Sequence, residues 1–252
     1  MKSMKRLFLA SLMASILAPA AVRADDPAAP PSATAPTKPW TNETEFSYVS
    51  ANGNTKSTTT SGKEKFAYTL KKTVFEIFGG GLGTKSAGVV TAEQYNAGEK
   101  ISYKLSERNY TFEQFRWDKD RFAGINDRYD STAGFGRELI VTDTDKLIAE
   151  IGGGWTAEDR LIVPNQNFGT GRFYTKYTRT VTATVNFSQD GEYIQNLDDK
   201  DNGRAKTETA VTAAISKHFS IKGSYVWKWV GVPPLGFGRS DTLTTVSLLA
   251  VY

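Results

Sequence analysis

The stretch Thr242-Leu-Thr-Thr-Val-Ser-Leu-Leu-Ala-Val-Tyr252 decides the fold class. Side chains alternate between the two faces of a β-strand, so Val246, Leu248, Ala250 and Tyr252 share one face of this segment. An apolar face that ends on an aromatic residue is typical of a transmembrane β-barrel strand. We therefore expect the protein to lie in the outer membrane of a Gram-negative bacterium.

The first residues of the chain predict export. Lys2, Lys5 and Arg6 precede an apolar run that ends at Ala18, and a small-residue cleavage site follows at Val22-Arg23-Ala24. The apolar run is shorter than the roughly 20 residues that a transmembrane helix needs. We expect a signal peptide at 1–24, a Pro/Ala-rich periplasmic linker at 25–39 and a barrel domain at 40–252.

The charge balance argues against a nucleic-acid partner. The chain has 31 basic and 27 acidic residues, a formal net charge of +4. Lys2, Lys5, Arg6 and Arg23 precede the expected cleavage site and no acidic residue does, so the mature chain would carry 27 of each. An overall basic charge is therefore not expected after processing. With no cysteine and one histidine, His218, neither a thiolate nor a zinc site is expected, and we expect no cofactor.

From residue 40 onward, short alternating segments rich in Thr, Tyr, Phe, Val and Gly are separated by polar clusters. The pattern predicts about twelve strands, near 41–51, 57–70, 73–83, 92–105, 109–118, 128–141, 146–157, 169–179, 182–196, 204–217, 219–230 and 241–252. The fold class that follows is all-β, a closed antiparallel transmembrane β-barrel of the outer-membrane type. The alternative is a soluble barrel or sandwich with the same apolar faces turned inward.

The connections between these segments alternate in length, which favours the membrane barrel. The connections at 70–73, 105–108, 142–145 and 216–218 are tight. Longer links are expected at 51–57, 84–92, 119–127, 158–168, 197–203 and 231–240. Short periplasmic turns and long extracellular loops are what outer-membrane barrels show.

The alternation also assigns residues to the two faces of the wall. Charges facing lipid are costly, so the apolar sets should face outward. The aromatic residues expected in two membrane girdles are Tyr103, Trp155, Phe219, Trp227, Trp229 and Tyr252. The charged residues expected in the lumen are Glu113, Glu138, Glu150, Glu208, Lys222 and Lys228, which Lys65, Arg116 or Arg137 could join depending on register. Because charges of both signs could neutralise one another, we favour a largely filled lumen over a narrow pore.

Three segments resemble a known family. They are Trp117-Asp-Lys-Asp-Arg-Phe-Ala-Gly-Ile-Asn-Asp-Arg-Tyr129, Ala51-Asn-Gly-Asn-Thr-Lys56, and the run Gly223-Ser-Tyr-Val-Trp227 with Pro233-Pro234 and Ser240-Asp-Thr242. They are similar to the YdiY-like proteins, a domain-of-unknown-function family described as salt-induced outer-membrane proteins. The resemblance covers about residues 40–252. It implies an outer-membrane barrel of unestablished activity, so it supplies no catalytic residues.

Three segments contain residue types that could carry chemistry. Gly79-Gly-Gly-Leu-Gly-Thr-Lys-Ser86 lacks the Gly-Lys-Ser/Thr order and the following helix of a phosphate-binding loop. A lipid hydrolase would need His218 beside Ser216 or Ser220 with a third orienting group, which a tight turn does not supply by itself. The outer-loop acidic residues Asp118, Asp120, Asp127 and Asp130 could bind Ca²⁺ or Mg²⁺, but interleaved arginines favour a solvated, paired loop.

These observations favour a non-enzymatic outer-membrane barrel associated with envelope integrity or with salt and osmotic stress. The alternatives are a narrow passive pore for small solutes or ions, and an outer-membrane lipid hydrolase. The expected partners are the lipid bilayer, lipopolysaccharide and, through the C-terminal strand, the outer-membrane barrel assembly machinery.

Overall fold

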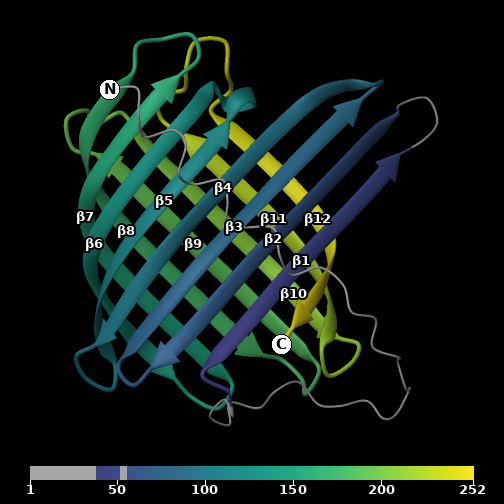
Figure 1. Ribbon diagram of the computed structural model, residues 1–252, viewed down its shortest axis with the longest axis vertical. Helices are drawn as coiled ribbons and strands as arrows, with labels where there is room; N and C mark the ends of the chain where they lie inside the picture. Colours follow the sequence, from purple (N-terminus) through teal and green to yellow (C-terminus); the bar gives the residue numbers. More distant parts are fainter. Residues whose placement is uncertain (1–37, 52–55) are drawn as a thin grey trace.

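The computed structural model describes residues 38–51 and 56–252, which form a closed antiparallel barrel (Figure 1). Each strand pairs with its neighbours in sequence, and the first strand pairs with the last. The twelve strands expected from the sequence are confirmed. The expected signal peptide, and the linker as far as residue 37, lie outside the described residues.

The strands are long enough to cross a membrane when tilted, since each has at least 12 residues. Their bounds are β1 (Trp40–Ala51), β2 (Ser57–Leu70), β3 (Thr73–Ser86), β4 (Val89–Lys104), β5 (Asn109–Asp120), β6 (Ile125–Val141), β7 (Asp145–Arg160), β8 (Gln166–Thr180), β9 (Val185–Asn196), β10 (Gly203–Ala214), β11 (Phe219–Val230) and β12 (Ser240–Val251). A short 3₁₀ helix, η1 (Arg121–Ala123), follows β5. Among the described residues, no helix has the length and apolar character needed to cross a bilayer.

The two ends of the barrel differ in their connections. The end that carries the C-terminus has short turns, and the opposite end carries the longer loops after β7 and β11 (Figure 1). The long link expected at 84–92 is wrong. β3 and β4 extend into it and are joined by the two-residue turn Ala87-Gly88, where both residues have positive φ (49° and 83°). Such a turn matches the twist of the flanking strands, so pairing continues to the hairpin tip.

The two faces of the wall have opposite chemistry. On β7, Ile151 is 68% exposed and the adjacent Glu150 is 1% exposed. On β6, Phe135 is 64% exposed, whereas Thr132 on the opposite face is 6% exposed. Apolar side chains therefore cover the outside and polar side chains fill the inside. The structure therefore differs from the alternative of a soluble barrel or sandwich, in which the apolar faces would point inward.

The barrel closes where the last strand meets the first. Pairing runs from Glu43 opposite Val251 to Phe46 opposite Leu248. Below this ladder the backbone N–H groups of Asn42 and Tyr252 each donate to the other residue's carbonyl at 3.0 Å. The expected pairing of the terminal strand with the first strand is thus confirmed.

Candidate functional site in the barrel lumen

Glu150 is the most deeply buried carboxylate of the described lumen. It lies inside because its outward neighbours on β7 are apolar, so strand alternation turns it inward. One carboxylate oxygen pairs with the ammonium group of Lys100 on β4 and accepts a hydrogen bond from the Tyr110 hydroxyl at 2.8 Å. The other oxygen accepts from Arg172 on β8 at 2.9 Å. The negative charge is therefore fully paired.

The ion pairs continue across the lumen from Arg172. Its Nε donates to Glu192 of β9 at 2.6 Å, and Glu192 also accepts from Arg116 of β5 at 2.9 Å. Arg116 in turn donates to Asp130 of β6 at 3.0 Å and lies 3.0 Å from Asp118. The contact between Arg116 and Glu192 joins strands that are four positions apart in the ring. These side chains therefore fill the space between distant parts of the wall.

The same network reaches the end of the barrel that carries the longer loops, which we call the outer mouth. Asp130 pairs with Arg204 of β10 and accepts from the Thr156 hydroxyl at 2.5 Å. Glu158 accepts from Arg128 at 2.7 Å and lies 3.6 Å from Arg204. The network then contains five cations and five carboxylates: Lys100, Arg116, Arg128, Arg172 and Arg204 with Asp118, Asp130, Glu150, Glu158 and Glu192. We call this set the main network. It is charge-balanced.

Aromatic rings support the cations of the main network. The Lys100 ammonium lies 4.9 Å from the centre of the Phe112 ring, and the Arg172 guanidinium lies 5.5 Å from it. The Tyr174 ring lies 5.0 Å from the Arg172 guanidinium. A cation over an aromatic face is stabilised electrostatically, more so when it is shielded from water. This explains a buried phenylalanine, 4% exposed, on the polar side of the wall.

A second, smaller set of ion pairs lies near the closing seam. Lys222 of β11 donates to Glu45 of β1 at 2.9 Å and to Glu208 of β10 at 2.7 Å. Lys63 of β2 lies 3.6 Å and 3.7 Å from the same two carboxylates. Two cations again meet two carboxylates. Because Glu45 also accepts from the Ser247 hydroxyl of β12 at 2.9 Å, this set connects the strands on both sides of the seam.

One contact spans the full width of the barrel. The Lys228 ammonium of β11 donates to the Gln94 side chain of β4 at 2.7 Å and lies 3.9 Å from the carboxylate of Asp120 on β5. β11 and β5 are six positions apart in either direction around the ring. A single lysine thus bridges opposite walls.

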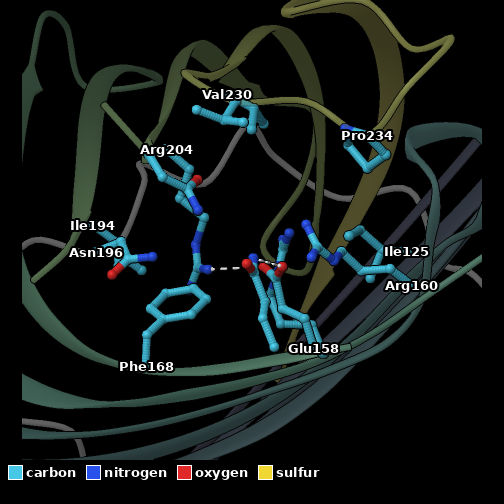
Figure 2. A pocket seen from close by; sticks show the side chains of 13 residues that line it. Ile125, Glu158, Arg160, Phe168, Ile194, Asn196, Arg204, Val230 and Pro234 are labelled. Atoms are coloured by element: carbon cyan, nitrogen blue, oxygen red, sulfur yellow. Dashed lines mark hydrogen bonds and ion pairs between the residues drawn. The ribbon is translucent and has the colours of Figure 1, made fainter. Parts of the chain in front are cut away.

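A pocket opens at the outer mouth, where Arg128, Glu158 and Arg204 of the main network line it (Figure 2). The space between its lining side chains is about 370 Å³, a volume that includes open solvent, and both apolar side chains and charged groups line it. Figure 2 shows Arg204 extending toward Glu158, with the Phe168 ring beneath its guanidinium group. A smaller void of about 180 Å³ lies among the charges of the main network and shares Ile194 with the mouth pocket.

Comparison of the chain with known proteins identifies its family. Residues 44–252 match DUF481, described as a protein of unknown function. The chain belongs to DUF481. The family expected from the sequence is therefore confirmed, and the uncharacterised protein YdiY of Escherichia coli K12 is 27% identical over 212 residues, 84% of this chain and 82% of that protein.

Solved structures with a similar course of the chain are also known. The NanC porin has 9% sequence identity and a TM-score of 0.49, and the match covers 84% of this chain and 97% of NanC. The translocator domain of the autotransporter NalP from Neisseria meningitidis has 11% identity and a TM-score of 0.49, covering 84% and 86%.

Most of the expected lumen charges of this DUF481 protein lie inside the barrel. Glu150, Glu208, Lys222 and Lys228 make the contacts described above, and Glu138 accepts from Lys146 at 2.9 Å. Lys65 and Arg116 also lie inside, where Lys65 pairs with Glu76 at 2.5 Å.

The expected lumen position of Glu113 is wrong. Glu113 is exposed on the outer face of β5, because Phe112, Gln114 and Arg116 occupy the inner face. Arg137 is likewise exposed, on the outer face of β6. Phe112 lies on the inner face of β5, where the cationic groups of Lys100 and Arg172 lie over its ring, so an apolar side chain does not by itself identify the outward parity of this strand.

The expected girdle aromatics lie on the outer face. Tyr103, Trp155, Phe219 and Tyr252 are exposed, whereas Trp227 and Trp229 are half-buried. The Trp227 indole donates to the Ser240 hydroxyl at 2.7 Å. The Tyr252 ring stacks on His218, with ring centres 5.4 Å apart.

The expected outer-loop acidic residues do not form one cluster. Asp130 and Asp118 point into the lumen, and Asp120 accepts from the backbone N–H of Ala123 at 3.0 Å. Asp127 faces outward and accepts from the Trp117 indole at 2.9 Å. Within the described part of the chain, no group of three or more acidic or histidine side chains is placed to hold a metal ion.

The residues of the expected hydrolase and phosphate-loop alternatives have structural roles. Ser216 accepts backbone N–H groups in the β10–β11 turn, including that of Phe219 at 3.2 Å, and His218 stacks on Tyr252. The glycine-rich run at 79–86 lies within β3. Sequence reasoning missed Glu192 and the rings of Phe112 and Tyr174, which lie beside the cationic groups of Lys100 and Arg172. The available signal was the alternation along β9, where Phe187 and Tyr193 share one parity and Ser188, Asp190 and Glu192 share the other.

Proposed function

We propose that this protein is a non-enzymatic outer-membrane barrel with an ion-paired, closed lumen that contributes to envelope integrity under salt or osmotic stress. The observation that carries the proposal is the Lys228 bridge between opposite walls, together with the balanced main network. A barrel of twelve strands lies between the side-chain-filled eight-stranded type and the open sixteen-stranded porins. Side-chain packing therefore decides whether it conducts.

The pairing supports a closed lumen on energetic grounds. An ion that entered would have to separate pairs such as Glu150 with Arg172, whose side chains are 0% and 5% exposed. Breaking a buried pair leaves an uncompensated charge, which is strongly unfavourable. A water-filled pore would instead keep its charged groups hydrated.

The outer face supports the location. Apolar residues such as Ile151 and Phe135 are exposed around the barrel, and only a bilayer would cover such a surface continuously. The lipid bilayer and lipopolysaccharide are the partners that follow. The terminal strand, paired with β1 and ending on Tyr252, would be the segment that the barrel assembly machinery engages.

Planar-bilayer recording tests the closed lumen. We expect the purified wild-type protein to show no stepwise conductance. The double substitution Arg116→Ala and Lys228→Ala removes two cross-lumen contacts and should produce conductance steps. Arg121→Ala, which removes an exposed arginine of η1, should remain silent. Steps from the wild type equal to those of the double variant would overturn the closed lumen.

A narrow passive pore is the second candidate. The mouth pocket and the smaller void have Ile194 as a common lining residue, so a solute path through the lumen would pass this side chain. If this path conducts, wild-type steps should appear in the same recordings and should vanish on Ile194→Trp.

The envelope role has its own test. A strain that lacks the gene should release more of a periplasmic marker enzyme after a shift to high salt, and the wild-type gene should restore retention. Equal release from the two strains would contradict the role without bearing on the lumen.

A further inference from the structure

Three carboxylates lie on the outside of one part of the barrel, where lipid would be expected. Glu64 of β2, Glu99 of β4 and Glu113 of β5 are all exposed. Each alternates with inward residues and shares the outer face with apolar neighbours such as Phe66 and Phe115, which are 38% and 43% exposed. These glutamates therefore face the membrane and not the lumen.

The strand register places the three glutamates in one band. Glu64 lies opposite Gly79 of β3, and Gly79 lies opposite Ala97, two residues from Glu99 on β4. Glu99 lies opposite Phe115 of β5, two residues from Glu113. The band crosses β2 to β5 continuously. We call this surface the acidic wall.

Two of the three glutamates of the acidic wall, Glu64 and Glu99, lie away from the barrel ends, and Glu113 lies four residues from the start of β5. Glu64 is four residues from Tyr68 and Glu99 is four residues from Tyr103, both exposed aromatics nearer the short-turn end. Four residues advance roughly 13 Å along a strand. Strands of such barrels tilt by about 35–45°, so this advance is roughly 10 Å along the membrane normal, which places both carboxylates inside an outward apolar band about 25 Å tall.

The rest of the described outer face is different. From β6 through β12 and on β1, outward positions away from the strand ends carry apolar, small, hydroxyl or amide side chains. The outward cation Arg137 of β6 lies opposite Asn109, the first residue of β5. None of the three glutamates takes part in an ion pair within the described residues. An ionisable group that faces hydrocarbon is costly and marks a functional position.

We propose that the acidic wall is a docking surface for a second membrane protein that presents Lys or Arg side chains to Glu64, Glu99 and Glu113. The inference rests on the membrane location proposed above. Charge complementarity selects the partner: acyl chains offer no hydrogen bond, and phosphate-bearing lipids would repel the carboxylates. An added Cβ would meet nothing within 4 Å at Gly83 and one atom at 3.9 Å at Gly62, so a partner could approach this backbone closely.

A second copy of the same chain fits less well. Two copies inserted in the same direction are related by an axis perpendicular to the membrane, so residues meet groups at the same depth. The outward basic residues of the described strands lie near strand ends: Lys85, Lys119, Arg137 and Arg179. A partner copy would therefore bring no cation to the depth of Glu64 and Glu99.

Photocrosslinking in intact cells tests the proposal. A photoreactive amino acid is placed at Ala97 in the acidic wall or, as a control, at Val211 on the outer face of β10. We expect a discrete protein adduct from position 97 only. The triple substitution Glu64→Gln, Glu99→Gln and Glu113→Gln should reduce its yield at least tenfold. The crosslinked partner peptide should carry a Lys or Arg, and exchanging that residue for Glu together with Glu99→Lys should restore the adduct.

The controls separate the possible failures. Membrane fractionation and heat-modifiable gel mobility show whether each variant is a folded outer-membrane barrel, and failure of the wild type there would refute the location. Given a folded barrel, an adduct of the protein with itself would assign the wall to a second copy and overturn the proposal. Adducts with lipid alone, or an adduct insensitive to the triple substitution, would also overturn it.

Discussion

Arg172→Met is the substitution that tests most directly whether the main network holds the barrel together. The Arg172 side chain is 5% exposed and contacts Glu150 at 2.9 Å and Glu192 at 2.6 Å. Methionine keeps much of the volume but removes the charge and all five N–H donors. The two carboxylates would stay buried with one cation fewer.

The expected loss in the free energy of unfolding depends on which cations remain beside Glu150 and Glu192. Removing one member of a buried ion pair costs about 3–5 kcal/mol. Glu150 keeps Lys100, and Glu192 keeps Arg116, so we expect the lower value, about 3 kcal/mol. That loss would change the unfolding equilibrium roughly a hundredfold, since each 1.36 kcal/mol is a factor of ten.

The assay is urea unfolding of the protein refolded into phospholipid vesicles, followed by tryptophan fluorescence. Lys63→Met is the matched control, because the Lys63 side chain is 44% exposed and its carboxylates lie at 3.6 and 3.7 Å. Such a pair is worth about 0–1 kcal/mol. Equal losses from Arg172→Met and Lys63→Met would refute the reasoning.

Three further predictions concern the wall itself. Gly154→Ala would bring a Cβ within 1.9 Å of a backbone oxygen and should cost about 1–3 kcal/mol in urea unfolding, whereas Gly153→Ala, with 3.7 Å of space, should be tolerated. Phe46→Cys with Leu248→Cys should crosslink on oxidation in this cysteine-free chain, giving a reduction-sensitive shift on a denaturing gel, and the single variants should give none. Deleting Tyr252 should lower the amount of barrel in the outer-membrane fraction, and unchanged levels by immunoblot would contradict its role in assembly.

The strands could be predicted because period-two alternation is a local property of the sequence. The expected strands at 57–70 and 219–230 coincide with β2 and β11. The expected loop at 84–92 failed for a local reason too, since Ala87 and Gly88 form a tight turn that lets both strands extend. Polar and glycine content predicts a connection at this point, but it does not distinguish a long loop from a hairpin tip.

The ion pairs could not be predicted, because they join residues far apart in the chain. Lys222 and Glu45 are 177 residues apart, and Arg116 and Glu192 are 76 apart. Which cation meets which carboxylate depends on strand register, tilt and barrel width together. The sequence could indicate that such charges lie inside, but it could not assign their partners.

Glu150 and Glu113 show that a charge in the lumen and a charge on the outer face carry different functional information. Both are glutamates within strands, but Glu150 is enclosed by Lys100 and Arg172, whereas Glu113 lies on the outer face without an ion pair among the described residues. A charge in the lumen can be satisfied by the chain itself, so its presence informs on stability and closure. Glu113 on the membrane side has no such partner among the described residues, so its charge would have to be satisfied by another molecule. For a closed barrel, the mismatches with lipid on the outer face are therefore a more direct guide to its partners than the charges it encloses.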